Sequence, residues 1–124
     1  MEVNARFDHF NFNVTNLDES IKFYNKAFGL TEQSRITADD GSYIIVYLAD
    51  KETSFKLELT WLRDHPQKYD LGECEFHLCL RVDNYKEVWQ YHEGMGIICF
   101  VNEKMGLYFV EDPDGYWIEV LPRK

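Results

Sequence analysis

At 124 residues and 14.8 kDa the chain has the length of a single domain, and its 45% hydrophobic content is too high for a disordered protein. Its formal net charge of −9 argues against a nucleic-acid partner, because phosphates would repel such a surface. The sequence contains neither a signal peptide nor an apolar run of transmembrane length, so we expect a cytoplasmic protein with no membrane partner.

The first half of the chain predicts a strand, a helix and three further strands. Alternating apolar residues indicate the first strand over 7–14. Apolar residues at helical spacing predict a helix over Leu17–Phe28, capped by Asn16 or Asp18 and ended by Gly29. Turn signals at 39–41 and 50–53 then separate three predicted strands, at 31–37, 43–49 and 55–61.

The second half repeats this order after an irregular connection. The predicted linker covers 63–73, and a strand over 75–82 follows it. Asn84 with Glu87 resembles a capping box, and Val88 with Tyr91 gives the next helix a short apolar stripe. Glycines at 94 and 96 end this helix, and the last three strands are predicted near 97–101, 106–111 and 116–121.

The two halves are an internal repeat. Val follows His by five residues and Asn follows it by seven in both halves, starting from His9 and from His77. Each half also ends in an apolar-Glu-apolar triplet, around Glu58 and Glu119. We therefore predict an α+β fold in one domain, 1–124, made of two tandem βαβββ modules at about 5–62 and 74–122. Side by side, the modules would form an open eight-stranded barrel around a cleft, with the helices outside.

The repeat also predicts a metal site. Four predicted strands each place one polar residue opposite an apolar face: His9, Glu58, His77 and Glu119. A buried carboxylate is costly unless it is paired, protonated or bound to a metal, and two His with two Glu in matching phase favour the metal.

The remaining His and Cys residues point to no second site. We expect His65 to be exposed, and His92 has no evident partner on its helix. Cys79 shares the face of His77, but the three cysteines lack metal-type spacing, so we interpret it as an inert structural thiol.

Four motifs resemble those of the vicinal oxygen chelate superfamily and, within it, glyoxalase I (lactoylglutathione lyase). They are Asp18-Glu-Ser-Ile-Lys-Phe-Tyr24, Leu57-Glu-Leu-Thr60, Tyr69-Asp-Leu-Gly72 leading to Phe76-His77, and Phe109-Val-Glu-Asp-Pro-Asp-Gly-Tyr-Trp-Ile-Glu119. The resemblance covers nearly the whole chain. It places the metal ligands of the family on the same four residues that strand phase selects.

The resemblance implies that the chain isomerises the hemithioacetal of methylglyoxal and glutathione to S-lactoylglutathione. A divalent ion would polarise the substrate oxygens and stabilise the enediolate that forms when the carbon proton leaves. Glu119 is the first choice of base, with Glu58 as its counterpart. One ion per site is implied, and mixed N and O ligands favour Ni²⁺ or Co²⁺, with Zn²⁺ as the alternative.

The implied thiol contacts depart from the family pattern. Asn13 stands where many members have an Arg for the carboxylates of glutathione, and Leu62 stands where they have an Asn. Lys104 matches a basic loop residue used for the glycyl carboxylate, although it could equally be a solvated turn lysine. We therefore take Asn13 and Lys104 as substrate-binding candidates and leave the identity of the thiol open.

Three other functions are compatible with the same scaffold. An acyl-CoA epimerase would use the same carbon-acid chemistry. A dioxygenase would need an open coordination position on iron, which the fourth ligand fills here. A metal-free binding protein would not need the four ligands. Exposed sheet edges and a half-open cleft would favour a homodimer. The linker is long enough for sites formed within one chain or shared between two.

Overall fold

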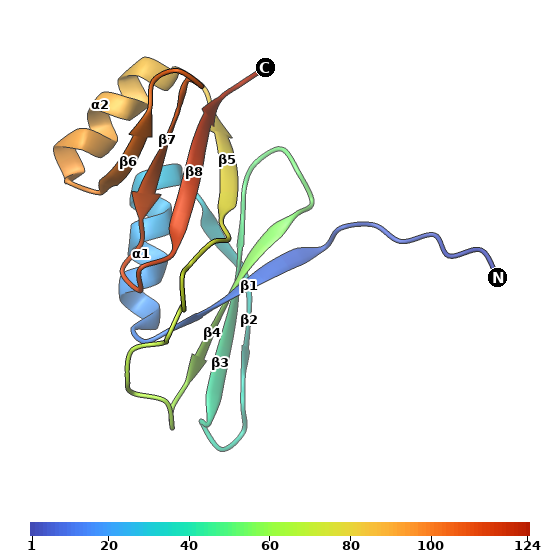
Figure 1. The fold of residues 1–124 in the computed structure, drawn as a ribbon. Helices are drawn as coiled ribbons and strands as arrows, with labels where there is room; N and C mark the ends of the chain where they lie inside the picture. The colour runs from blue at the N-terminus through green and yellow to red at the C-terminus, as the bar shows by residue number, and fades with distance from the viewer. The chain divides into compact units, whose positions relative to one another are not determined.

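The computed structural model describes residues Met1–Lys124, which divide into two compact units, Met1–Tyr69 and Asp70–Lys124 (Figure 1). Each unit is one βαβββ module, as the sequence predicts. The boundary between the units falls inside the predicted linker. Neither helix is long and apolar enough to span a membrane.

The first unit forms one mixed four-stranded sheet. Its elements are β1 (His9–Val14), α1 (Leu17–Phe28), β2 (Thr31–Thr37), β3 (Tyr43–Ala49) and β4 (Lys56–Leu62). The strand order is β1-β4-β3-β2, in which β1 and β4 are parallel and the other pairs are antiparallel. One sheet face supplies the core of this unit, namely Phe12, Val14, Val46, Leu48, Leu57 and Leu59. α1 contacts the same sheet at β2 and β4.

Both ends of α1 are fixed by local hydrogen bonds. The Asn16 side chain accepts a bond of 3.1 Å from the backbone N–H of Glu19, so Asn16 rather than Asp18 is the N-cap. Gly29 adopts a left-handed conformation, with φ 71°, and its N–H donates to the carbonyl of Asn25 at 2.8 Å. The predicted helix is confirmed with its bounds.

The second unit repeats the topology of the first. Its elements are β5 (Leu78–Val82), α2 (Tyr85–Met95), β6 (Ile98–Asn102), β7 (Leu107–Glu111) and β8 (Trp117–Pro122). The strand order is β5-β8-β7-β6, in which β5 and β8 are parallel and the other pairs are antiparallel. The same order in both units confirms the predicted internal repeat.

The strands that carry the two candidate His residues begin later than predicted. His9 is the first residue of β1, and His77 lies just before β5. Phe10 and Phe76 were expected on the core faces but are 43% and 42% exposed. Strand alternation assigns a face to each residue, but it does not say how far along the strand the core extends.

The predicted capping box at the start of α2 is wrong. Asn84 has φ 53° and ψ 50°, and its side chain makes no capping hydrogen bond. An N-cap side chain reaches the N–H groups of the first turn from an extended backbone, whereas Asn84 is left-handed. The backbone carbonyl of Asn84 still accepts from the N–H of Val88 at 2.9 Å, so the helix starts where predicted.

The buried residue of α2 is His92 rather than Tyr91. Tyr91, expected in the apolar stripe, is 47% exposed, whereas His92 is fully buried. The Nδ1 atom of His92 lies 2.8 Å from the hydroxyl of Tyr108 on β7, which is also fully buried. Burial raises the pKa of Tyr108. The partner that the sequence did not reveal therefore comes from the sheet of the same unit.

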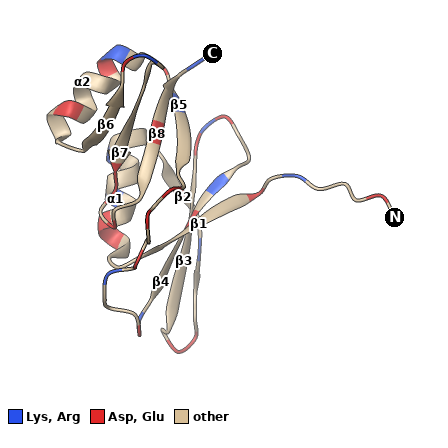
Figure 2. Ribbon diagram, viewed as in Figure 1, with Lys and Arg blue, Asp and Glu red and all other residues tan.

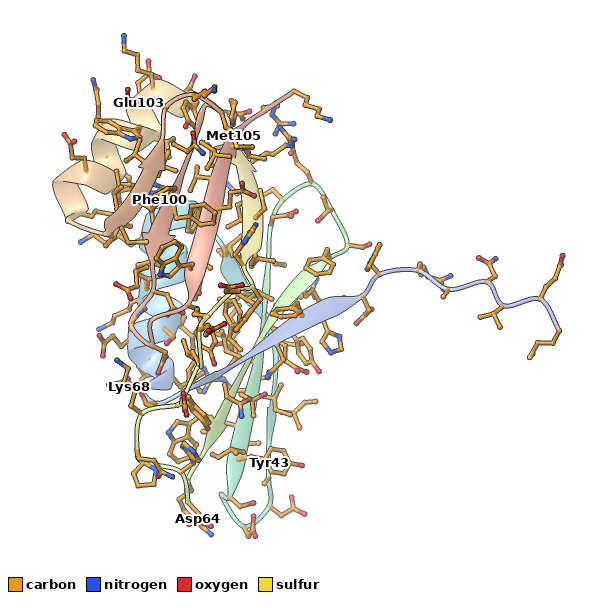
Figure 3. All side chains as sticks on the ribbon, in the orientation of Figure 1. Tyr43, Asp64, Lys68, Phe100, Glu103 and Met105 are labelled. Atoms are coloured by element: carbon orange, nitrogen blue, oxygen red, sulfur yellow. The ribbon has the colours of Figure 1, made fainter.

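We expect Tyr108→Phe to lower the free energy of unfolding by about 1–3 kcal/mol, because it removes a buried hydrogen-bond partner from His92 without changing the ring. Urea unfolding followed by tryptophan fluorescence would measure the loss. Tyr43→Phe makes the same change at an exposed ring (labelled in Figure 3) and should stay within about 0.5 kcal/mol. Equal effects of the two substitutions would contradict a stabilising role for the buried pair.

Candidate metal centre

Glu58 is placed by the alternation of β4. Leu57 and Leu59 are 3% and 0% exposed on one face of the strand, so Glu58 projects from the other. The parallel pairing puts Asn11 of β1 opposite Glu58, and the antiparallel pairing puts Tyr47 of β3 opposite it. The Glu58 side chain is 14% exposed, so its carboxylate sits in a largely desolvated position.

His9 and Glu58 form the first pair. The Nε2 atom of His9 lies 3.6 Å from Oε2 of Glu58, and the ring meets Tyr47 edge-on with centroids 5.5 Å apart. The other ring nitrogen, Nδ1, lies 2.6 Å from Oδ2 of Asp8. Both nitrogens of this imidazole therefore face a carboxylate.

The His9–Glu58 pair shifts the pKa values of two neighbouring side chains, Asp8 and Tyr47. The hydrogen bond to His9, together with Lys56 at 3.6 Å, lowers the pKa of Asp8. Glu58, the register partner of Tyr47, raises the pKa of Tyr47, because a carboxylate favours the protonated hydroxyl as a donor and repels a tyrosinate. Glu58 thus lies beside a tyrosine of the neighbouring strand.

A tight turn leads into the strand that carries the second carboxylate. Oδ1 of Asp112 accepts from the backbone N–H groups of Asp114 and Tyr116, each at 2.9 Å. Gly115 has φ 92°, which only glycine adopts without strain. The turn sets the phase of β8, in which Ile118 and Val120 are fully buried and Glu119 points from the other face.

His77 and Glu119 form the second pair. Nε2 of His77 lies 3.2 Å from Oε1 of Glu119, whose side chain is 16% exposed. The His77 ring meets Phe109 edge-on at 5.0 Å, and Phe109 is the register partner of Glu119 on β7. Cys79 is the register partner of Glu119 on β5, and burial together with that carboxylate raises the pKa of Cys79 to about 12. The thiol therefore stays protonated at neutral pH, but Cys79 is exposed rather than part of the core.

The donor set of each pair fits half of a metal site. Two neighbouring ligands with bonds of about 2.1 Å to one ion lie about 3.0–3.4 Å apart, depending on the coordination angle. The nitrogen–oxygen separations of 3.2 and 3.6 Å are close to this range. No group of three or more His, Cys, Asp or Glu side chains that could hold an ion is present. The four predicted ligands thus occur as two equivalent pairs, one in each unit.

The two predicted substrate-binding residues have different surroundings. Asn13 is half-buried on β1, and its Oδ1 accepts from Asn11 at 2.8 Å, while Asn11 accepts from Thr60 at 2.6 Å. Lys104 is exposed in the β6–β7 turn, between Glu103 and Met105 (both labelled in Figure 3). Nothing in the contacts of Asn13 or Lys104 assigns a ligand to either residue.

Sequence reasoning did not single out Asp8 or Tyr47 and placed His65 imprecisely. Asp8 could have been noticed because it directly precedes a candidate ligand, and Tyr47 because the turn at 50–53 fixes the pairing of β3 with β4. His65, expected to be exposed, instead stacks on Tyr69 with centroids 3.9 Å apart, and its Nδ1 is buried without a hydrogen-bond partner. Its stacking partner Tyr69 begins one of the quoted motifs, but nothing in that motif indicates a contact with His65.

Almost the whole chain matches a known protein family. The family model described as "Glyoxalase/Bleomycin resistance protein/Dioxygenase superfamily" matches residues 6–120. A lactoylglutathione lyase of Neisseria meningitidis is 32% identical over 127 residues, which cover 96% of this chain and 91% of the relative.

Solved structures agree with this assignment. The trypanothione-dependent glyoxalase I of Leishmania major has a TM-score of 0.85 and 29% identity, covering 96% of this chain and 87% of that one. An antibiotic-binding protein from Streptomyces sp. CB03234 shares the fold alone, with a TM-score of 0.70 at 18% identity and full coverage of both chains. The chain therefore belongs to the glyoxalase/bleomycin resistance protein/dioxygenase superfamily. Within it, the chain is a glyoxalase I-like protein.

Proposed function

We propose that the chain is a metal-dependent glyoxalase I, which detoxifies methylglyoxal by isomerising its hemithioacetal with glutathione, or with another thiol, to the S-lactoyl thioester. One observation carries the proposal: each unit presents an imidazole Nε2 beside a largely buried mid-strand carboxylate, at equivalent positions of the repeat. The similarity to lactoylglutathione lyases over almost the whole chain supports the same reaction.

The two pairs together would supply two nitrogen and two oxygen ligands to one divalent ion per site. This mixture favours Ni²⁺ or Co²⁺ with water completing an octahedron, and Zn²⁺ is the alternative. When bound, the ion would polarise the substrate oxygens and stabilise the negative charge that develops on them.

The protein's own side chains would move the proton. Glu119 is the proposed base, which takes the proton from the carbon next to the carbonyl and returns it to the neighbouring carbon. Its strand neighbours are the protonated thiol of Cys79 and the ring of Phe109, so its carboxylate has only a weak donor beside it. Glu58 lies opposite Tyr47, whose hydroxyl is a stronger donor than a thiol, and is better suited to remain a ligand.

Recognition of the thiol cosubstrate would depend on Asn13 and Lys104. Asn13 hydrogen-bonds to Asn11 where an arginine would bind glutathione carboxylates, and Lys104 is the proposed cation for the remaining carboxylate. Lys and Arg are spread over both units among more numerous Asp and Glu (Figure 2). Because the Leishmania major relative is described as trypanothione-dependent, we propose comparing glutathione with trypanothione as cosubstrates.

The deciding experiment combines elemental analysis with turnover. The purified protein would be stripped with a chelator, loaded separately with Ni²⁺, Co²⁺ or Zn²⁺, and assayed with methylglyoxal and each thiol for thioester formation. We expect one ion per site and activity that depends on it. Absence of turnover with every metal and thiol, together with tight binding of another small molecule, would favour an epimerase or a binding protein instead.

We further propose a homodimer in which two chains share each site, so that one supplies His9 with Glu58 and the other His77 with Glu119. All seven residues of β2 are exposed at the edge of its sheet, and a sheet edge of this kind can be covered by a partner.

Mixing inactive His9→Ala chains with inactive Glu119→Gln chains should restore part of the activity. A mixed dimer with shared sites contains one doubly damaged and one intact site. Remixing each variant with itself is the control. No recovery in a mixture shown by mass spectrometry to contain heterodimers would mean that each site lies within one chain, and a monomer by light scattering would exclude sharing altogether.

A further inference from the structure

The two His–Glu pairs differ in what holds the imidazole. We propose that Asp8 is a positioning residue for His9, which makes His9 and Glu58 the anchoring half of the metal site. This inference rests on the proposed function, because it concerns the metal of that site.

The contact of Asp8 fixes which nitrogen of His9 can bind a metal. A carboxylate only accepts hydrogen bonds, so the 2.6 Å contact with Oδ2 of Asp8 places the ring proton on Nδ1. In a neutral imidazole the other nitrogen then carries a lone pair, and that nitrogen, Nε2, is the atom facing Glu58 at 3.6 Å. Asp8 thus selects the tautomer and the ring orientation that a metal ligand needs.

The second unit lacks this arrangement. The residue before His77 is Phe76, whose side chain has no acceptor. The register partner of Glu119 on β7 is Phe109, where the first unit has the hydroxyl of Tyr47 opposite Glu58. Asp8 and Tyr47 therefore have no polar counterpart at the equivalent positions of the second unit, where Glu119 has only the thiol of Cys79, a weak donor, beside it.

The difference suits the two proposed roles of the pairs. Ligands held in place before the metal arrives lose less side-chain freedom on binding, which strengthens the affinity. A carboxylate that must also carry a proton gains from fewer fixed contacts. The first pair would hold the ion while Glu119 of the second exchanges between ligand and base.

The test is the metal affinity of full-length Asp8→Asn, measured by competition with a chromophoric chelator for Ni²⁺. Partners of metal-bound histidines typically contribute about 10–100-fold in affinity. The Asp8 side chain is 67% exposed, so we expect the lower end, a weakening of about 10-fold. Glu2→Gln removes the same charge from the same exposed N-terminal segment and should leave the affinity unchanged.

Two further measurements separate positioning from a general effect on structure or charge. Nitrogen-15 spectra of the metal-free protein should show His9 protonated on Nδ1, and Asp8→Asn should shift it toward the Nε2-protonated form. In a His9→Ala background, where the other three ligands remain, adding Asp8→Asn should weaken binding no further, because Asp8 acts only through His9.

The outcomes distinguish this inference from the proposed function. A wild-type protein that binds no divalent ion overturns the metal site itself. Wild-type binding with an unchanged affinity in Asp8→Asn, or an equal loss in Glu2→Gln, overturns the positioning role while leaving the metal site in place.

Discussion

Replacing Glu119 with Gln should lower the turnover of the hemithioacetal by about 10²–10⁴-fold, the usual cost of losing a general base. The amide keeps the size of the side chain and an oxygen that can act as a weak ligand, but it cannot take a proton. The metal content should therefore fall much less than the rate. Steady-state kinetics on the metal-loaded protein, with elemental analysis of the same sample, would separate the two effects.

The matched control is Glu111→Gln, which makes the same change at an exposed position on β7. Its turnover should equal that of the wild type. A Glu119→Gln protein with metal bound and nearly normal turnover would transfer the role of base to Glu58, where Glu58→Gln should then show the large loss.

Replacing His77 or His9 with Ala should lower the metal content and abolish the activity while leaving the fold intact. The His9 and His77 side chains are 37% and 44% exposed, so truncation leaves little cavity, whereas the proposed metal site would lose one of its two nitrogen ligands. Metal content after dialysis and far-UV circular dichroism would report on the site and the fold separately.

His65→Ala serves as the control for these substitutions, because His65 stacks on Tyr69 and belongs to neither pair. It should retain metal and turnover. Full activity in a metal-free His77→Ala protein would contradict the metal-site proposal.

Periodicity predicted most of the fold because each signal was local. The helix over Leu17–Phe28 shows its spacing, its Asn16 cap and its terminal Gly29 within a few residues, and all three are present in the structure. The face of Glu58 and of Glu119 followed from strand alternation. The internal repeat then predicted that the two units share a topology, which the strand orders confirm.

Features that depend on tertiary contacts or on backbone angles were not predictable in this way. The capping box at Asn84 failed because the residue types do not reveal a left-handed backbone. The bond between His92 and Tyr108 joins residues from two elements, so a single histidine on a helix gave no sign of it. For the same reason the contacts of Asp8 and Tyr47 emerged only once β1, β3 and β4 were placed in register.

Because β1 and β4 pair in parallel, the His9–Glu58 pair forms late in folding. His9 and Glu58 come from opposite ends of their module and meet only after the intervening helix and hairpin have formed. Pairing between residues far apart in the sequence first costs the entropy of closing the loop between them, and the stabilising contacts form only afterwards. A growing or misfolded chain would therefore present single ligands, which capture metal weakly, and the first pair would appear only on a finished unit. The contribution of the first pair to metal binding would thus begin only when its unit has folded, and it would end when proteolysis removes either strand.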